Sequence, residues 1–569
     1  MHAVLKRALT WFDNYALLIL ASFAVAFIPL YPKLPLFEAI PGYIVRVRLE
    51  DILIVVVSLV WFIQAIRGKI AWKNSALGWI ATYALGGLLT LISAVLIIQT
   101  IPAQLLHIGK STLHYFRYLE YFSLVAIVFS AITTKKHLYI LLGVMMAALI
   151  GVTVYGYGQR YYYWPVYSTM NREFSKGVRL YLTEHARVQS TFGGHYDLSA
   201  YLVILLPITL ALALAATNKW LRIALHAAHI GGLWLMVVAA SRTSFFGYLI
   251  AAELVVILFA LYQTKWAAKL RYFVVHSAAL GLLVGWMMFF YGESIYDRFL
   301  QVLDGYPEYR QIYHDTNKKR KELFGNALVF IGLKQPSPPS DGMSLAELEA
   351  RNRVLADSDE RPSSDKPSDV YTDVPDQVQV ATMSADGTMG FVTVERDRTY
   401  SDNALKYGLS LAIRLDTLWP RAIAGFQRNP IFGSGYATLT KESIEQFTEA
   451  ESTDNNFLRT LGETGLFGFL TFYGLIVVIM RKAFLHLRAK DTLLRSLSVG
   501  VLTASIGLLI NATYIDVFAA SKVAFTYWAV VGLYLAAEQL LATNQSTVSS
   551  PPTNQPARST QHAKKHRHS

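Results

Sequence analysis

The chain has 569 residues, of which 53% are hydrophobic and 16% charged, with a mean hydropathy of +0.34 and a formal net charge of +13. Soluble domains carry about 25% charged residues. Here the deficit coincides with many apolar stretches of about 20 residues, the length that crosses a bilayer. These values exclude an ordinary soluble protein. The absence of cysteine excludes a disulfide scaffold, a thiolate metal site and a cysteine nucleophile.

Twelve apolar stretches predict transmembrane helices, so we expect an all-α polytopic membrane protein. We interpret the first stretch as a retained span rather than a signal peptide, because it is long and lacks a convincing small-residue cleavage site. The predicted spans are 15–31, 50–66, 77–98, 117–134, 137–156, 198–217, 221–240, 243–263, 272–292, 465–482, 496–515 and 519–540.

The loops on one side of these spans hold most of the basic residues, for example Lys135 and Lys136. Basic loops stay on the cytoplasmic side, so the pattern predicts that both termini are cytoplasmic. The same bias accounts for the net charge without a nucleic-acid partner. We expect four parts: a bundle of nine spans (1–292), an extracytoplasmic region (293–464), a bundle of three spans (465–543) and a disordered basic tail (544–569).

The extracytoplasmic region is where we expect irregular polar segments over a rigid bundle. Its residues 335–378, rich in Pro, Ser and Asp, predict a mobile insertion without chemistry. Residues 403–428 and 454–464 predict amphipathic helices, the first with a break or kink at Pro420.

Several outer arginines are candidates for binding an anion. In a continuous helix Arg414, Arg421 and Arg428 would form one cationic stripe, which could equally be a solvated or headgroup-facing surface. Arg242 lies in a short turn between two spans, where it could extend toward the interface or present its planar donors to a phosphate.

Two further polar segments adjoin predicted spans. Arg187 and His195 lie in one of them, where Gly193 and Gly194 permit a tight turn and Asp197 is placed to cap the next helix. Turn-and-cap chemistry is the alternative to a functional role there. In the second segment, Asp454 precedes an apolar helical pattern, so it could be an N-cap or a catalytic carboxylate.

Three short motifs in this order resemble the O-antigen ligase and polymerase superfamily. The resemblance covers nearly the whole chain, since the span number, the orientation and the large outer loop also fit. The motifs are Ser241-Arg242-Thr243-Ser244, Asn429-Pro430-Ile431-Phe432-Gly433-Ser434-Gly435, and Asn455-x-x-Leu458 followed by Glu463-x-Gly465-x-x-Gly468.

The resemblance implies a GT-C-type membrane glycosyltransferase without a nucleotide sugar, a cofactor or an obligatory metal. Such an enzyme transfers a glycan from an undecaprenyl diphosphate carrier to an acceptor glycan or lipid, on the extracytoplasmic face of the inner or plasma membrane. It implies diphosphate ligands at Arg187, Arg242 and one of Arg414 or Arg421, and a substrate contact at Asn455. The leaving diphosphate needs cationic partners and the acceptor hydroxyl needs a base.

The sequence departs from the family at one position. Its ligases usually have a histidine immediately before the asparagine of the last motif, whereas this chain has Asp454. Either Asp454 is the base, or His195 or Glu451 reaches the site, or the acceptor differs from that of the ligases. The departure favours a polysaccharide polymerase or a related surface-glycan transferase.

Two other classes of protein share the predicted topology. A twelve-span transporter or lipid-linked glycan flippase needs charges along a pathway at midplane depth. Deep ionisable residues are few here, and Glu253 is the clearest one. A non-catalytic membrane scaffold would leave the outer arginines scattered. An enzyme requires Arg187, Arg242 and the 403–465 segment to converge at one outer site.

Overall fold

The computed structural model describes residues 2–38, 46–70, 75–170, 174–182, 186–292, 376–383, 389–396, 399–439 and 452–548, together with 295 and 319. The described chain is almost entirely helical. Its strands form two separate antiparallel hairpins, β1 (Pro35–Glu38) with β2 (Arg46–Arg48) and β3 (Asp376–Met383) with β4 (Met389–Arg396). Strand β3 includes residues 376–378 of the predicted mobile insertion, and the rest of that insertion lies outside the described residues.

The helices follow the apolar stretches of the sequence. Long apolar runs form helices because a helix satisfies every main-chain polar group within the segment itself, which hydrocarbon requires. The helices are α1 (His2–Trp11), η1 (Phe12–Ala16), α2 (Leu17–Leu30), α3 (Leu49–Ile66), α4 (Ser75–Ile92), η2 (Ser93–Ile97), α5 (Leu105–Ala131), α6 (Lys135–Tyr162), η3 (Phe174–Lys176), α7 (His195–Ala215), α8 (Lys219–Ala239), α9 (Arg242–Leu261), α10 (Trp266–Tyr291), α14 (Asp402–Tyr407), α15 (Leu409–Ile413), η5 (Arg414–Leu418), α16 (Trp419–Arg428), α17 (Asn456–Leu485), η6 (His486–Arg488), α18 (Thr492–Ala512) and α19 (Ser521–Val548).

Eleven helices in the described chain are long and apolar enough to cross a membrane, which confirms a multi-pass membrane protein. The remaining predicted span, 117–134, lies in α5. This helix has 27 residues but is less apolar than the eleven, because it carries Lys110, Arg117 and Glu120. Helix α19 runs on to Val548, so the first residues of the predicted tail are helical, and residues 549–569 lie outside the described ranges.

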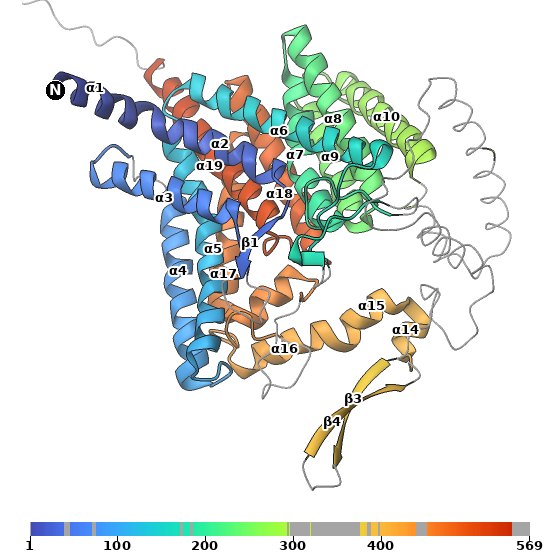
Figure 1. The fold of residues 1–569 in the computed structure, drawn as a ribbon. Coiled ribbons are helices and arrows are strands. Elements are labelled where there is room, and N and C mark those ends of the chain that lie inside the picture. The colour runs from blue at the N-terminus through green and yellow to red at the C-terminus, as the bar shows by residue number, and fades with distance from the viewer. Residues whose placement is uncertain are drawn as a thin grey trace, which may run out of the picture.

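The two ends of the bundle differ (Figure 1). The start of α1 and the end of α19 lie at one end, which we call the terminal end. Strand β1 and helices α14 to α16 lie at the opposite end, which we call the loop end. Helices α2, α4, α6, α8, α10 and α18 finish at the loop end, whereas α3, α5, α7, α9, α17 and α19 begin there.

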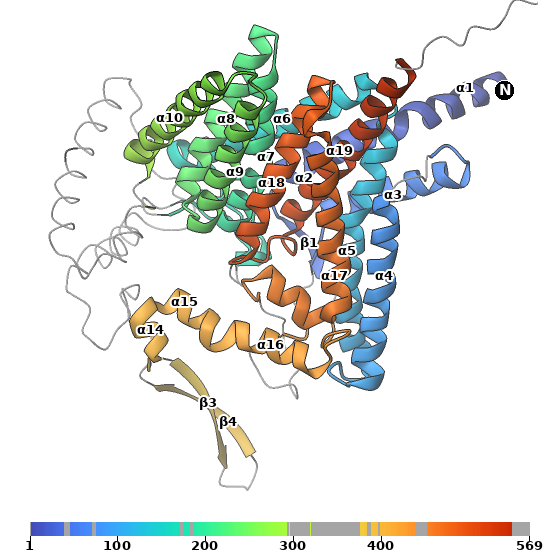
Figure 2. The same cartoon turned by 180° about the vertical axis from the view of Figure 1, so that it is seen from behind.

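The centre of the bundle is formed by α7, α18 and α19, which pack against one another. Figures 1 and 2 both show α3, α4, α5 and α17 on one side of this centre and α8, α9 and α10 on the other. Helix α7 is 83% buried along its apolar stretch, whereas α10 is 11% buried along its own. An apolar helix that the protein leaves uncovered is suited to contact with lipid tails.

Candidate active site at the loop end

Helices α14 to α16 form a helical arm, residues 402–428, across the loop end (Figure 1). Gly408 has a positive φ of 83° and separates α14 from α15. From Leu409 to Arg428 the backbone stays helical, through the π-helical segment η5. Of the predicted break or kink at Pro420, the break is therefore wrong. Pro420 lies in the first turn of α16, and the wider π turn before it accommodates the missing N–H.

The three arginines of this arm have different environments. Arg414 is 6% exposed, Arg421 is half-buried and Arg428 is exposed. A π turn adds a residue to the helical repeat, which shifts the positions on either side of it relative to each other. The structure therefore does not place Arg414, Arg421 and Arg428 on one solvated cationic stripe, and Arg414 alone among them turns fully into the protein.

The glycine motifs hold the arm against α17. Gly465 has φ 64° and ψ −165°, which interrupts α17 and leaves main-chain groups on both sides without helical partners. The turn after α16 supplies those partners. A Cβ on Gly433 or on Gly465 would lie about 2.5 Å from the facing main chain, so only glycine permits this approach. The bonds run from Ser434 N–H to Gly462 O (2.9 Å), Gly435 N–H to Glu463 O (2.9 Å), Leu466 N–H to Pro430 O (2.8 Å) and Phe467 N–H to Ile431 O (3.0 Å).

Asp516, in the turn between α18 and α19, organises the residues that lead into α17. Its carboxylate is 6% exposed and accepts from the Ser452 hydroxyl (2.8 Å) and from the N–H groups of Thr453 (2.8 Å) and Asn455 (3.1 Å). The guanidinium of Arg459 also donates to it, at 3.0 Å. Four donors on one carboxylate fix the backbone on either side of Asp454.

Asp454 faces the helical arm and pairs with Arg414. Its Oδ2 lies 2.8 Å from Nη2 of Arg414, and its Oδ1 lies 2.8 Å from the Ser452 hydroxyl, whose single hydrogen is shared with Asp516. The residue has a positive φ of 51°, an uncommon conformation for aspartate that the surrounding bonds maintain. The side chain of Asp454 is still 33% exposed, so the carboxylate is accessible from outside.

The helix cap expected of Asp454 belongs to its neighbour. The side-chain oxygen of Asn455 accepts from the Leu458 N–H at 3.0 Å and caps α17. Asn455 therefore caps the helix through its side-chain oxygen, and its predicted substrate contact stays a prediction. Asp454 is left without a capping bond, so its carboxylate is available for chemistry.

Burial raises the pKa of Asp454 above the usual aspartate value of 3.8, and the Arg414 charge and the Ser452 hydrogen bond partly offset the rise. A carboxyl group with a raised pKa is a stronger base once it is ionised. The local environment thus lessens the disadvantage of aspartate relative to histidine at this position.

His195 and Arg187 contact each other. A guanidinium can only donate, so Nη1 of Arg187 donates to Nε2 of His195, which uses the lone pair of that nitrogen. His195 is 7% exposed at the start of α7. This geometry suits a residue that positions Arg187. It suits the predicted base less well, because the lone pair that a base needs is already in use. Nη2 of Arg187 is buried and has no hydrogen-bond partner among the described residues.

The loop that carries Arg187 also lies beside Arg242. The Val188 N–H donates to the Val238 carbonyl at 3.3 Å, close to the end of α8, and half-buried Arg242 begins α9 after a two-residue turn. Arg187, His195 and Arg242 are therefore near one another in the fold. We call them the α7–α9 group, and we call Arg414 with Asp454 the α16–α17 group.

Helix α18 connects these two groups. It packs against α7, α9 and α17, and the turn that follows it carries Tyr514 and Asp516. The ring of Tyr514 lies 4.2 Å from the guanidinium carbon of Arg414. Arg421 lies half-buried on α16, and Glu451 lies outside the described residues.

A further buried cluster ties α2, α7 and α19 together. Lys522 is fully buried, and its ammonium donates to the carbonyls of Pro29 (3.3 Å), Tyr31 (2.5 Å) and Thr191 (2.8 Å). Lys33 pairs with Asp197 at 3.3 Å. The predicted capping role of Asp197 is therefore wrong, since α7 begins after Gly194 without a side-chain cap. Because Thr191 belongs to the Arg187 loop, Lys522 anchors that loop.

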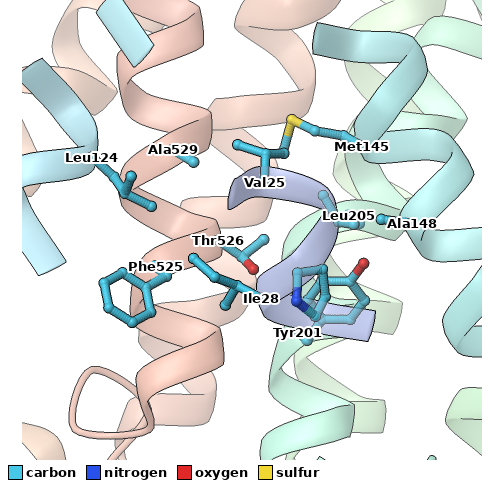
Figure 3. A pocket seen from close by; sticks show the side chains of 11 residues that line it. Val25, Ile28, Leu124, Met145, Ala148, Tyr201, Leu205, Phe525, Thr526 and Ala529 are labelled. Carbon is cyan, nitrogen blue, oxygen red and sulfur yellow. The ribbon is translucent and has the colours of Figure 1, made fainter. Parts of the chain in front are cut away.

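A small pocket lies inside the bundle between α2, α5, α6, α7 and α19 (Figure 3). Apolar side chains line it, and Tyr201 and Thr526 are the only residues of its lining with a hydroxyl group. Such a lining offers no charge to a diphosphate and few donors to a sugar. This pocket is therefore poorly suited to a lipid-linked glycan diphosphate.

Sequence reasoning missed Asp516, Arg459 and Tyr514. One signal was present: an aspartate in a turn of a few residues between two apolar spans is unusual and suggests a role. The partner of Asp516 could not be deduced, because Arg459 is 57 residues away in sequence. In the described part of the chain, no group of three or more His, Asp or Glu side chains could hold a metal ion.

Comparison with protein families and with curated proteins gives no match. No family model matches the chain, and no curated protein matches it significantly. Any functional interpretation therefore rests on the residues and their geometry.

Proposed function

We propose that this chain is an integral membrane glycosyltransferase of the O-antigen ligase and polymerase type. It moves a glycan from an undecaprenyl diphosphate carrier to an acceptor hydroxyl, as a polysaccharide polymerase or a ligase-like enzyme. One observation carries the proposal: the accessible carboxylate of Asp454 lies 2.8 Å from the buried guanidinium of Arg414, at the end of a bundle of apolar helices.

The pair supplies the two groups that the reaction needs. The acceptor oxygen attacks the anomeric carbon of the donor sugar, the bond between that carbon and the diphosphate oxygen breaks, and the diphosphate leaves on its lipid carrier. Asp454 takes the proton of the acceptor hydroxyl, and Arg414 stabilises charge on the leaving group. A bound diphosphate competes with Asp454 for Arg414, which frees the carboxylate to act as the base.

The α7–α9 group supplies additional cationic donors. Arg187 has a buried Nη2 without a partner in the described chain, and Arg242 begins a helix nearby. Guanidinium groups bind phosphate oxygens through paired, planar donors. We assign Arg187 and Arg242 to the diphosphate together with Arg414, and leave Arg421 as a weaker alternative.

The proposal includes an orientation. We infer twelve crossings, made by the eleven apolar helices and α5, and an even number agrees with the start of α1 and the end of α19 lying at one end of the bundle (Figure 1). The basic loops, including Lys135 and Lys136, lie at the terminal end, so both termini are cytoplasmic. The active site then faces the extracytoplasmic side.

A transporter or lipid-linked glycan flippase is the alternative. Charges along a transport pathway would be distributed through the depth of the bundle. In the described chain, every fully buried Lys, Arg, Asp or Glu lies near the loop end, which favours a site over a pathway. These residues are Lys33, Arg46, Glu50, Lys110, Arg414, Glu463, Asp516 and Lys522.

Purified protein in liposomes tests the proposal directly. It is incubated with a polyprenyl diphosphate-linked oligosaccharide, with and without candidate acceptors, and the products are identified by mass spectrometry. A longer lipid-linked chain indicates a polymerase, and a new conjugate indicates a ligase. Movement of intact donor across the bilayer without any new glycosidic bond would contradict the proposal and favour a flippase.

A further inference from the structure

Two aromatic side chains adjoin the Arg414–Asp454 pair at the loop end. The ring of Tyr514 lies over the Arg414 guanidinium at 4.2 Å. Trp419, five residues after Arg414 on the helical arm, meets the same ring edge-on, with centroids 6.5 Å apart and planes at 88°. Both Trp419 and Tyr514 are half-buried, so part of each ring is exposed. The arm and the α18–α19 turn thus build one aromatic corner beside the catalytic pair.

This corner holds two hydrogen-bond donors without acceptors. Nε of Arg414 and Nε1 of Trp419 are both buried and have no partner among the described residues. Buried donors are normally satisfied, because leaving one unpaired costs free energy. Two such donors, on side chains that contact the same ring, indicate that an acceptor belongs there which the polypeptide does not provide.

The unpaired donors and aromatic rings of this corner indicate which kind of ligand it binds. A diphosphate would satisfy the guanidinium but would make no use of the two ring faces. A prenyl chain would cover the rings but leave the indole N–H unpaired in an apolar environment. A pyranose ring supplies both properties, with hydroxyl oxygens as acceptors and C–H faces that pack on aromatic rings.

We propose that Trp419 and Tyr514 form the binding subsite for the sugar ring next to the diphosphate of the lipid-linked glycan. The proposal rests on the proposed function and adds the part of the substrate that these residues recognise. Trp419 Nε1 donates to a sugar hydroxyl, Tyr514 packs on the face of the ring, and Nε of Arg414 donates to an oxygen between the sugar and the diphosphate.

The test measures binding, so it needs no turnover. The full chain in lipid nanodiscs is titrated with undecaprenyl diphosphate and, separately, with undecaprenyl diphosphate linked to one hexose, and the bound fractions are measured by native mass spectrometry. We expect wild type to bind the hexose-carrying lipid more tightly. In Trp419→Phe, which keeps a ring but loses the N–H, the affinity for that lipid falls about three- to tenfold, whereas the affinity for the bare carrier is unchanged.

Tyr514 gives a second, independent measurement. Tyr514→Phe keeps the ring and should bind both lipids as wild type does. Tyr514→Ala removes the ring and should weaken binding of the hexose-carrying lipid about three- to tenfold. Trp266→Phe is the matched control, since Trp266 is 78% exposed at the terminal end and its loss should change neither affinity.

Several outcomes overturn the subsite. Equal affinities of the two lipids in wild type exclude it, as does an unchanged affinity in both Trp419→Phe and Tyr514→Ala. An equal loss for both lipids assigns the corner to the diphosphate instead. If the variants lose affinity for the hexose-carrying lipid only, the subsite is supported. If the wild-type protein also transfers no glycan, the proposed function is contradicted and the subsite is not.

Discussion

Ion pairs at the loop end and at the terminal end of the bundle differ in how deeply they are buried. At the terminal end, Lys135 pairs with Asp491 at 3.5 Å while Lys135 is 52% exposed, an arrangement that contributes little to stability. At the loop end, Arg459 and Asp516 are 11% and 6% exposed. Burying such charges costs several kcal/mol in desolvation, and apolar side chains would fold as well or better. Charges kept at that cost are candidates for function.

The largest effect that would test this contrast is expected at Asp454. Replacing it with Asn keeps the shape but removes the base, so transfer should fall about 10²–10⁴-fold. Burial raises the pKa of Asp454. Wild-type transfer should therefore decline as the pH falls through a value above 3.8, because the protonated carboxyl cannot accept a proton, and the residual activity of the variant should lack that decline.

Initial transfer rates across a pH series measure this effect. Asp416→Asn is the matched control, because Asp416 lies exposed on the same arm and its carboxylate accepts hydrogen bonds from Ser401 and Asn403. It should keep wild-type transfer and the same pH profile. Full activity of Asp454→Asn would remove the base assignment.

Arg414 should show the next largest effect. Arg414→Met preserves most of the side-chain volume but removes the donors to the leaving group, so kcat should fall about 10²–10³-fold. Arg428→Met changes an exposed arginine of the same arm and should leave kcat unaltered. If the two variants lose activity equally, the arm acts through its total charge and not through one buried contact.

Replacing Asp516 tests how much its buried carboxylate contributes to protein stability. Asp516→Ala leaves four donors, Arg459 among them, without their acceptor, which should cost about 3–5 kcal/mol of unfolding free energy. Transfer should decrease less than in the two preceding variants, because Asp516 acts through the backbone beside Asp454. Thermal unfolding in detergent, with transfer measured below the transition, separates the two effects. Unchanged unfolding would exclude the organising role.

The smallest effect belongs to the terminal end. Lys135→Met breaks an exposed pair, so stability should change by about 0.5 kcal/mol or less and transfer should not change. Thermal unfolding and the liposome assay measure both quantities. A large loss of stability would mean that charge is as important at the terminal end as at the loop end.

The sequence predicted the spans well because their signal is local. The stretch 198–217, for example, corresponds to α7 at His195–Ala215, and 243–263 to α9 at Arg242–Leu261. Apolar length and flanking charge are properties of one segment, and hydrocarbon enforces them independently of the remaining chain.

The candidate site was predictable only in part. Residue types and motif order singled out Asp454 and left Arg414 and Arg421 as alternatives, because the contact of Asp454 with Arg414 joins positions 40 residues apart. The cap, Asn455, could not be distinguished from Asp454 by pattern, since both are good N-cap residues in sequence. The positive φ of Asp454 decides the matter, and it follows from the bonds to Asp516, which lies two spans later.

The main-chain hydrogen bonds around Gly465 limit how the arm can move. Four hydrogen bonds fasten the turn after α16 to both halves of the interrupted α17, so the arm and the helix behave as one rigid body at that point. Opening the site by swinging the arm away from α17 would break all four bonds. Under the proposed function, we therefore expect the donor lipid to bind without displacement of this end of the arm.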